Sequence, residues 1–524
     1  MVRKAGSTSF AVYGKSVLSI ALWGLSLFCL PQAALGVTLV KETAQKKVIE
    51  LRTGQQTGSP LKVRASRNEY LSLTFQISGA DPASFQVLTP KTGKITYKVY
   101  RAAPAPLSSI KSPADALIPL EQGSIPAWSL QVWATFKVPP DLAKGVYSHD
   151  MVFQDRNASF RQPVELQVWN FVLPEDLPIT IMGNIWGERD WFARYGVKTE
   201  AQYNTVLKDY LRSMREYKFN ALGPFLFPRI KGGEDFSKYD QILDYALNHL
   251  KYQYFLLPMA RINKQNLGQT KDRFLQETQE YYPRILEYLR RHRWENRAIN
   301  QVVDEPLQPY YPAVYELYAR SKELAPPVKT LCTGKEPDPR LAKVINIWAL
   351  TPRFFDPAKA AAAKGQGQEI WLYANRLHTL NHPRTEPRLI GWFLYQYQFS
   401  GYYFWGVNDW RQDPWTVESG KIDRWRRGSF YYPQSRTGAP LASTRLEALR
   451  QGFQDYQYLV LLDQARARGK VPLAAYEAVR QRVASLTRDF HPWMPLGLAR
   501  ITMTELEGAR QQIGELLDKA SLSN

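Results

Sequence analysis

The fold is decided by a repeated unit whose clearest copy lies near the middle of the chain, where residues 298–306 read AINQVVDEP. This copy is a short apolar run that ends in two acids. Pro306 stops it, because proline cannot donate a hydrogen bond to a sheet. A helix-length amphipathic stretch follows over residues 310–324. Since apolar runs without alternation are typical of strands buried on both faces, the stretch predicts one strand–helix unit of a parallel sheet.

Similar units recur from residue 178 onward, which makes eight apolar runs in all. The runs are Ile179–Trp186, Asn220–Phe225, Tyr254–Met259, Ala298–Glu305, Thr330–Gly334, Ile345–Leu350, Ile370–Asn375 and Tyr402–Asn408. Eight units over about 230 residues match the usual size of a (β/α)8 barrel. A doubly wound open sheet is the alternative, but no glycine-rich phosphate loop follows the first run. We therefore predict an α/β fold with a TIM barrel over residues 178–440.

The residues on either side of the barrel have other patterns. Over 37–175, β-rich runs separated by Pro, Gly, Ser and Asp clusters predict an antiparallel β-sandwich. Within it, the Pro- and Ser-rich residues 103–127 are expected to form a long loop. Residues 441–524 are expected to form a helical extension, which begins at a capping box made by Thr444 and Glu447. Two further helices are expected near 472–488 and 499–519.

The composition supports a large globular protein. The chain has 524 residues, of which 44% are hydrophobic and 22% charged, so disorder and coiled coil are excluded as the main architecture. Two cysteines provide neither a disulfide framework nor a four-cysteine zinc site. The 30 Tyr, 23 Phe and 15 Trp supply flat faces that suit sugar rings, although large cores use them too.

The first 36 residues resemble a secretory signal peptide. A basic start containing Arg3, Lys4 and Lys15 precedes an uncharged apolar run over 16–30, and small residues at 34–36 suit cleavage. We therefore expect a secreted or periplasmic protein, with an uncleaved N-terminal anchor as the alternative. The run is shorter than the ~20 residues that a spanning helix needs.

The chain is strongly basic. Its 68 Lys and Arg against 48 Asp and Glu give a net charge of +20, and removal of the three basic residues of the signal leaves +17. Such a surface suits an acidic glycan or an anionic envelope surface. No nucleic-acid-binding motif is visible, so nucleic acid is not an expected partner. The expected partner is a glycan substrate.

The chemistry is concentrated in Asp304 and Glu305, at the end of the fourth run. Barrel enzymes work at the carboxyl ends of their strands. Neighbours on a regular strand point to opposite faces, so both acids reach one pocket only if the chain turns there. Two adjacent carboxylates repel, so one can stay protonated while the other stays ionised. This division of labour is typical of glycoside hydrolysis.

Other strand ends carry residues that suit sugar binding, through aromatic faces and through Asn or Arg hydrogen bonds. The candidates are Trp186, Arg261, Trp348, Tyr373, Asn375, Trp405, Asn408 and Trp410. No metal or other cofactor is expected, because His378 and His382 lie in loop-like sequence with no nearby acid to complete a site. No Gly-x-Ser-x-Gly motif supports a serine hydrolase. Cys332 is expected to be a small buried residue.

Over residues 37–465 the chain resembles glycoside hydrolase family 123 and the related domain-of-unknown-function family 4091. The matching stretches are Val303–Pro306, Glu369–Tyr373, Gly401–Asn408, Ser443–Arg450 and Gly452–Tyr456, with Arg67–Tyr70 and Gly145–Tyr147 in the sandwich. Asn375 and Gln457 depart from the family, which often has Cys and Glu at these positions. The resemblance implies that Arg445, Arg450 and Asp455 hold the C-terminal helix to the barrel.

The resemblance implies an exo-acting β-N-acetylgalactosaminidase that retains configuration with the help of the substrate's own acetamido group. By the motif, Asp304 would orient that group, and Glu305 would act as general acid and then as general base. Two alternatives remain: a glycosidase for a sugar without an acetamido group, and a non-catalytic glycan-binding protein on the same scaffold.

Overall fold

The structure, a computed structural model, describes most of the chain after the first 45 residues. The described residues are 46–90, 94–104, 114–120, 130–186, 189–223, 235–258, 267–352, 355–373, 380, 383–410, 412–416, 429–434, 436–488 and 501–521. The expected signal peptide, residues 1–36, lies outside them.

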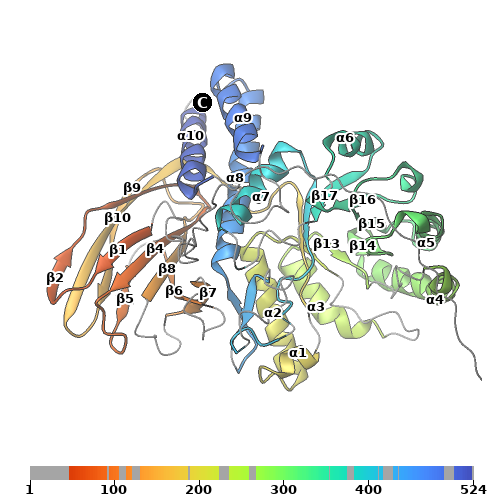
Figure 1. Cartoon of the computed structure of the whole chain (residues 1–524), viewed down its shortest axis with the longest axis horizontal. Coiled ribbons are helices and arrows are strands. Elements are labelled where there is room, and N and C mark those ends of the chain that lie inside the picture. Colours follow the sequence, from red (N-terminus) through yellow and green to blue (C-terminus); the bar gives the residue numbers. More distant parts are fainter. Residues whose placement is uncertain are drawn as a thin grey trace, which may run out of the picture. The chain divides into compact units, whose positions relative to one another are not determined.

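Eight parallel strands close into a barrel (Figure 1), which confirms the predicted fold. They are β11 (Thr180–Gly183), β12 (Ala221–Leu222), β13 (Tyr254–Leu256), β14 (Ala298–Gln301), β15 (Lys329–Gly334), β16 (Ile347–Leu350), β17 (Glu369–Tyr373) and β18 (Gly401–Phe404). Strand β11 pairs with both β12 and β18, so the barrel has no free edge. Each of the eight apolar runs overlaps one of these strands.

Helices surround the barrel. They are α1 (Arg189–Ala193), α2 (Glu200–Glu216), α3 (Asp240–Asp244), α4 (Leu267–His292), α5 (Tyr311–Leu324), α6 (Pro357–Gly365), α7 (Thr385–Gln396) and α8 (Thr444–Ala467). Helix α3 continues as a π-helix over Tyr245–His249. The connection from β15 to β16 contains only a 3-10 turn, Pro339–Leu341, so the fifth unit lacks an α-helix.

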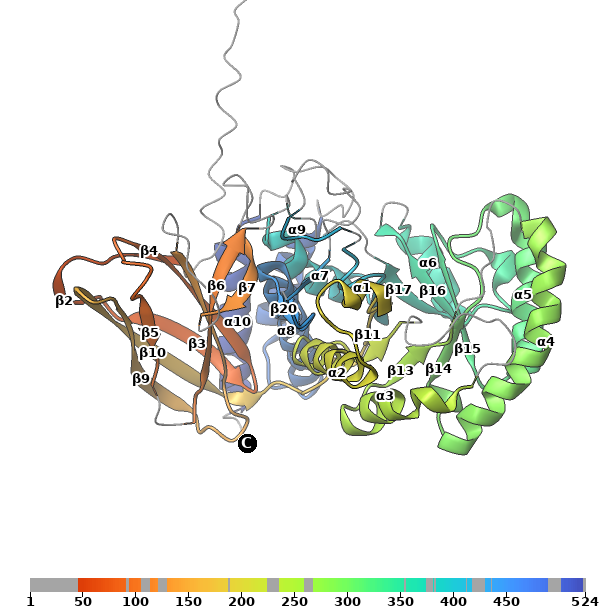
Figure 2. The same ribbon diagram turned by 90° about the horizontal axis from the view of Figure 1, so that it is seen from below.

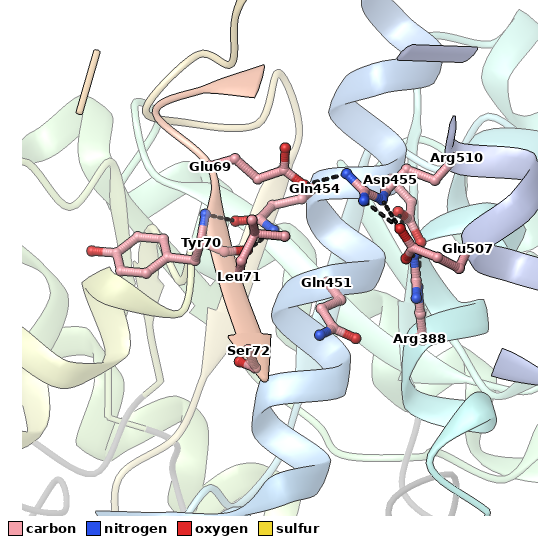
Figure 3. Close-up of a pocket in the computed structure, with 10 residues that line it drawn as sticks. All are labelled: Glu69, Tyr70, Leu71, Ser72, Arg388, Gln451, Gln454, Asp455, Glu507 and Arg510. Carbon is pink, nitrogen blue, oxygen red and sulfur yellow. Dashed lines mark hydrogen bonds and ion pairs between the residues drawn. The ribbon is translucent and has the colours of Figure 1, made fainter. Parts of the chain in front are cut away.

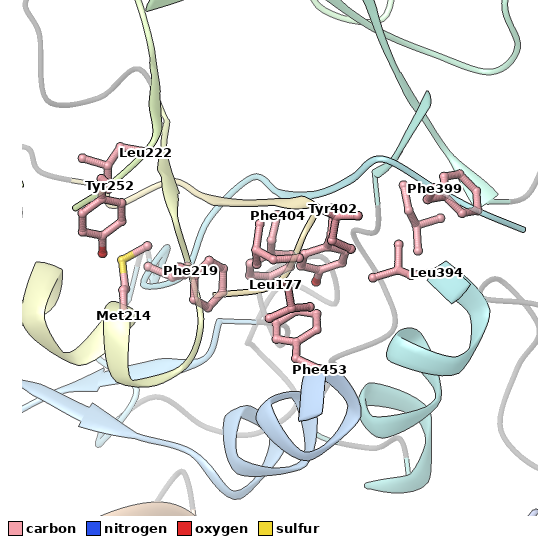
Figure 4. Packing of buried hydrophobic residues seen from close by; sticks show 14 of the residues in the cluster. Leu177, Met214, Phe219, Leu222, Tyr252, Leu394, Phe399, Tyr402, Phe404 and Phe453 are labelled. Carbon is pink, nitrogen blue, oxygen red and sulfur yellow. The ribbon is translucent and has the colours of Figure 1, made fainter. Parts of the chain in front are cut away.

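Alternate residues of the barrel strands enter two different cores. Ile299, Leu331 and Tyr403 belong to a small cluster inside the barrel. Residues one position away, such as Tyr402 and Phe404, belong to a larger cluster that lies between strands and helices (Figure 4). Burial on both faces explains why these strands are apolar throughout.

Residues 46–172 form the predicted sandwich of two sheets. One sheet has the order β1 (Lys46–Glu50), β4 (Tyr70–Ser78), β8 (Leu130–Lys137), β6 (Tyr97–Pro104), β7 (Ala114–Pro119). The other has the order β2 (Gly54–Thr57), β10 (Ala158–Val172), β9 (Gly145–Gln154), β5 (Gln86–Leu88), and β3 (Leu61–Arg67) also pairs with β10. The rings of Phe75 and Phe153, one from each sheet, lie 4.8 Å apart in the shared core.

Two details of the sandwich differ from the expectation. It is mixed rather than antiparallel, because β1 runs parallel to β4 and β10 runs parallel to both β2 and β3. The segment 103–127 is not all loop, because β7 lies within it and pairs with β6. Buried Ala116 and Leu117 provide the apolar side chains that hold this short strand in place.

Three helices, α8, α9 (Leu473–Thr487) and α10 (Met503–Ser521), follow a short hairpin of β19 (Tyr431–Pro433) and β20 (Pro440–Ala442). The expected capping box of Thr444 and Glu447 is not found: Ser443 is the N-cap of α8 and accepts a hydrogen bond from the Leu446 N–H at 3.1 Å. Helix α8 follows β18 and packs on it, with the rings of Phe453 and Tyr402 5.8 Å apart. It therefore occupies the place of the eighth barrel helix.

Helices α7 and α8 cross at two glycines. A Cβ atom on Gly391 would lie 1.8 Å from the carbonyl oxygen of Gly452, and one on Gly452 would lie 2.2 Å from the carbonyl oxygen of Arg388. Any larger residue would separate the two backbones. This close approach places the Arg388 and Asp455 side chains within reach of each other, and they bond at 2.7 and 3.1 Å.

A network of five charged residues joins the sandwich to α7, α8 and α10 around a cavity of about 20 Å³ (Figure 3). Glu69, between β3 and β4, binds Arg510 of α10 at 2.7 Å. Arg388 binds Asp455 and also Glu507, the latter at 3.2 Å. Arg510 pairs with Glu507 as well. Burial raises the pKa of Glu69 and of Asp455, so these carboxylates depend on the arginines to remain charged.

Two further contacts attach α8 to the rest of the molecule. Arg445 binds Asp115 of β7 at 2.8 Å. Glu447 accepts hydrogen bonds from Tyr217 at 2.5 Å and from Ser72 of β4 at 2.7 Å, and it pairs with Arg450. These residues are therefore structural, and they join α8 to the sandwich as well as to the barrel.

The sandwich, the barrel and the C-terminal helices belong to one compact unit. Residues Lys41–Asn524 make up a single compact unit that contains the sandwich, the barrel and the C-terminal helices (Figure 2). Among the described residues, no helix combines the length and apolar character needed to cross a membrane.

Candidate active site at the end of strand β14

The chain turns where the two acids follow β14. The strand ends at Gln301, and Glu305 adopts φ = +46°, a left-handed conformation that is uncommon for any residue except glycine. Asp304 is exposed and Glu305 is half-buried. Two adjacent carboxylates can reach one space only if the chain turns between them. The chain does turn at Glu305. A strained backbone at such a position is a common feature of functional sites.

The hydroxyl of Thr333, at the end of neighbouring β15, connects the two acids. Its Oγ1 donates to Oδ1 of Asp304 at 2.6 Å. It accepts from the backbone N–H of Glu305 at 2.9 Å and from Nε2 of Gln301 at 3.2 Å. A hydroxyl has one hydrogen to donate and two lone pairs, so these three bonds use its whole capacity.

Gln301 extends this hydrogen-bonded group across the barrel. Its Nε2 also donates to Oδ1 of Asp304 at 3.2 Å, and its Oε1 lies 3.5 Å from the hydroxyl of Tyr403 on β18. The Tyr403 hydroxyl accepts from Nδ2 of Asn184 at 3.1 Å. Gly223 makes room for Asn184, because a Cβ atom there would lie 1.0 Å from the Asn184 Oδ1. Residues from β14, β15 and β18, and from the end of β11, thus support one carboxylate.

The charge of Asp304 affects its neighbours. Burial, together with a smaller contribution from the nearby Asp304 charge, raises the pKa of Cys332 to about 12. The pKa of the Tyr403 hydroxyl is raised for the same two reasons, so it stays protonated and can donate. Cys332 is fully buried, as predicted, and has no role at the surface of the site.

Three of the predicted aromatic residues lie around the strand ends. Trp186 and Trp405 are half-buried, and their rings meet edge to face with centroids 6.0 Å apart. Tyr373 is buried inside the barrel, with its ring 5.1 Å from that of Tyr403. Asn408 is fully buried and binds both backbone groups of Trp186, at 2.7 and 3.3 Å. Asn408 is therefore placed to position Trp186 rather than to touch a sugar.

Two predicted sugar-binding residues have other surroundings. Trp348 is 0% exposed and packs in the cluster between strands and helices, since its neighbours Ile347 and Ala349 face the barrel interior. Trp410 is 2% exposed, and its Nε1 donates to the carbonyl of Tyr431 at 2.6 Å. Both are structural here, contrary to the expectation.

Arg261, Asn375, His378 and His382 lie outside the described residues. Among those that the structure does describe, no group of three His, Cys, Asp or Glu side chains is placed to hold a metal ion.

Sequence reasoning missed Thr333, Gln301, Asn184 and Tyr403. The signal that could have found two of them is the alternation of inward-facing residues. Ile299 and Leu331 face the barrel interior, so the residues two positions later, Gln301 and Thr333, face the same way at the strand ends. Polar residues at such positions of otherwise apolar strands are unusual.

Comparisons with known proteins identify a related catalytic domain. Residues 238–462 match the family model described as the glycoside hydrolase 123 catalytic domain, a range that includes β14, the two acids and most of α8. A family 123 glycoside hydrolase from Clostridium perfringens, studied for glycolipid glycan hydrolysis, has the same fold. Its TM-score is 0.64 at 13% identity, with 89% of this chain and 94% of that chain covered.

Two other solved structures are much less similar. A β-D-glucuronidase from Dictyoglomus thermophilum has a TM-score of 0.35 at 9% identity, covering 71% of this chain and 68% of its own. A GH10 xylanase from termite gut has a TM-score of 0.33 at 11% identity, covering 76% and 99%. These scores do not establish a shared fold. No curated protein matched the sequence. From the family match over residues 238–462, which cover β13 to β18, the protein is a glycosidase with a glycoside hydrolase family 123-like catalytic domain.

Proposed function

We propose that this glycosidase is a retaining, substrate-assisted β-N-acetylhexosaminidase of the N-acetylgalactosaminidase kind. The observation that carries the proposal is the turn at Glu305, which presents two successive carboxylates at one strand end and holds the first by Thr333. A pair of carboxylates with different surroundings is what acid–base cleavage of a glycosidic bond requires. The half-buried Trp186 and Trp405 would offer aromatic surface to a sugar ring.

The reaction would proceed in two steps. First, the acetamido oxygen of the substrate attacks the anomeric carbon while the bond to the leaving oxygen breaks, and Glu305 gives its proton to that oxygen. Asp304 holds the acetamido N–H and stabilises the positive charge of the resulting oxazolinium ion. Second, Glu305 takes a proton from water, the water oxygen bonds to the anomeric carbon, and the acetamido group is restored. Two inversions at one carbon retain its configuration.

Replacement of Glu305 by Gln tests the acid–base role. We expect Glu305→Gln to lower kcat on an aryl β-N-acetylhexosaminide by about 10²–10⁴-fold, because a positioned acid or base typically contributes that much. Binding of the glycoside should change little, since the amide has nearly the same shape. Glu323→Gln is the matched control, because Glu323 pairs with Arg320 on the outer helix α5. Wild-type turnover in Glu305→Gln would remove Glu305 from this role.

A thiazoline analogue of N-acetylhexosamine tests the assistance by the substrate. An enzyme that forms an oxazolinium ion should bind this mimic far more tightly than it binds substrate. A panel of para-nitrophenyl glycosides with and without the 2-acetamido group should show hydrolysis only of the former. Hydrolysis of a glycoside without the group, together with no inhibition by the thiazoline, would favour the alternative glycosidase.

The place of action is part of the proposal. The basic start and apolar run of residues 1–36 support secretion or export to the periplasm, and the net charge of +20 would favour anionic envelope surfaces. Since the Clostridium perfringens enzyme was studied for glycolipid glycan hydrolysis, a glycolipid glycan belongs in the substrate panel. Sequencing the N-terminus of the exported protein would test whether the signal is removed.

A further inference from the structure

We propose that Thr333 is a positioning residue that holds both carboxylates in their working geometry. One hydroxyl contacts the side chain of Asp304 and the backbone of Glu305 at the same time. Asp304 is exposed and follows the strand rather than lying in it, so its carboxylate needs a fixed partner to stay in one orientation. The Thr333 side chain comes from a regular strand and is fully buried, which makes it a rigid support.

The backbone at Glu305 also depends on Thr333. A left-handed conformation at a residue such as Glu305 is unfavourable, and it persists only where surrounding contacts hold it. The bond from the Glu305 N–H to Thr333 is such a contact, and it lies at the residue whose φ is +46°. Loss of this bond should let the turn relax and move the Glu305 carboxylate. A displacement of about 1 Å can reduce a reaction rate by 10²-fold.

Two substitutions distinguish the effect of the Thr333 hydroxyl on turnover from the effect of side-chain shape. Thr333→Val keeps the volume and removes all three hydrogen bonds, whereas Thr333→Ser keeps the hydroxyl. We expect Thr333→Val to lower kcat by about 10- to 100-fold with a smaller change in KM, because the loss affects the alignment of reacting groups. Thr333→Ser should restore most of the lost turnover.

The same strand offers a matched control. Thr330, near the start of β15, is also fully buried. Its hydroxyl lies 2.6 Å from the Val344 carbonyl and 2.9 Å from Oδ1 of Asn346, and it accepts from the Asn346 N–H at 3.1 Å. Thr330→Val therefore removes an equally bonded hydroxyl at the opposite end of the strand. We expect it to lower the unfolding midpoint as Thr333→Val does, while kcat stays near that of the wild type.

A double mutant shows whether Thr333 acts through Asp304. If it does, the part of the kcat loss that runs through Asp304 should disappear in an Asp304→Asn background, because residues that act as a unit are not additive. The loss that remains in this background measures the bond to the Glu305 N–H. A Thr333→Val effect as large in the Asp304→Asn background as in the wild type would overturn the claim that Thr333 holds Asp304. So would wild-type kcat in Thr333→Val, or an equal loss of kcat in Thr330→Val.

The inference rests on the proposed function only for the choice of substrate. If the wild type hydrolyses an aryl glycoside without the acetamido group, the proposed function fails, and the same variants are compared on that glycoside. If no glycoside in the panel is hydrolysed, crystal structures of the two Thr333 variants decide the matter. An unchanged Asp304 rotamer and an unchanged φ at Glu305 in Thr333→Val would then overturn the inference.

Discussion

The acids around α8 and the acids after β14 differ in burial and in the partners described for them. Glu69 and Asp455 are almost completely buried, and each bonds an arginine at 2.7 Å. Asp304 is exposed, and the hydrogen bonds described for its Oδ1 come from a neutral hydroxyl and a neutral amide. An arginine partner fixes a carboxylate in its charged form and blocks its lone pairs. Neutral donors such as these orient a carboxylate without neutralising its charge.

The difference in burial and partners predicts which acids are structural and which are functional. A buried, arginine-bound acid contributes to stability, and its removal should affect folding. An exposed acid beside a strained turn contributes little to stability, and its removal should affect turnover. Three measurements of stability test this distinction between the two kinds of acid.

The largest effect on stability is expected for Arg388→Met. The substitution removes the cation that binds Asp455 and Glu507, and leaving buried charges without a partner typically costs about 3–5 kcal/mol. Urea denaturation should show a much lower midpoint, while Glu305→Gln should leave the midpoint unchanged. The double variant Arg388→Met with Asp455→Leu should recover part of the loss, because it removes one of the stranded charges. Equal midpoints for Arg388→Met and Glu305→Gln would break the distinction.

A smaller effect should depend on pH and involve Glu507. Burial alone would raise the pKa of this carboxyl, but the charges of Arg510 and Arg388 outweigh burial and lower the pKa to about 2, from an ordinary value of 4.5. Its charge therefore stabilises the fold above pH 4.5, and this contribution is lost as the pH falls from 4.5 towards 2. The difference in unfolding free energy between wild type and Glu507→Gln should shrink by ~3 kcal/mol over that range. A constant difference would contradict the assignment.

The smallest effect is expected for an ion pair of similar length at the surface. Lys94 and Asp141 lie 2.6 Å apart, but their side chains are 58% and 67% exposed. Water and salt screen such pairs, so Lys94→Ala should not measurably change the urea midpoint. A shift as large as that of Arg388→Met would mean that burial is not what distinguishes the two kinds of pair.

The barrel could be predicted from sequence because its strands are buried on both faces and read as continuous apolar runs. The directions of strands in the sandwich could not, since alternation reports which face is buried and not which neighbour a strand pairs with. Strand β7 was missed because its apolar core is only a few residues long and lies in Pro- and Ser-rich sequence.

The sequence singles out the two acids as a candidate site because a charged pair at the end of an apolar run is conspicuous, and their catalytic role stays a prediction. Their support could not, because a lone hydroxyl such as that of Thr333 has no distinctive pattern. Trp348 was assigned to the site because it lies near a strand end. Its place between inward-facing Ile347 and Ala349 turns it to the other side of the sheet.

The contacts that attach α8 to its surroundings limit how the chain of this enzyme can be divided into fragments. Its charged side chains bond residues from β4, β7 and α7 and the residue that follows α2, so the helix is shared by what would otherwise be two separable modules. A fragment limited to the matched catalytic region, 238–462, would keep Arg445 and Glu447 but discard Asp115 and Ser72. The minimal expressible enzyme is therefore the sandwich and barrel together, and grafting the barrel onto a foreign partner would require a substitute for each of those bonds.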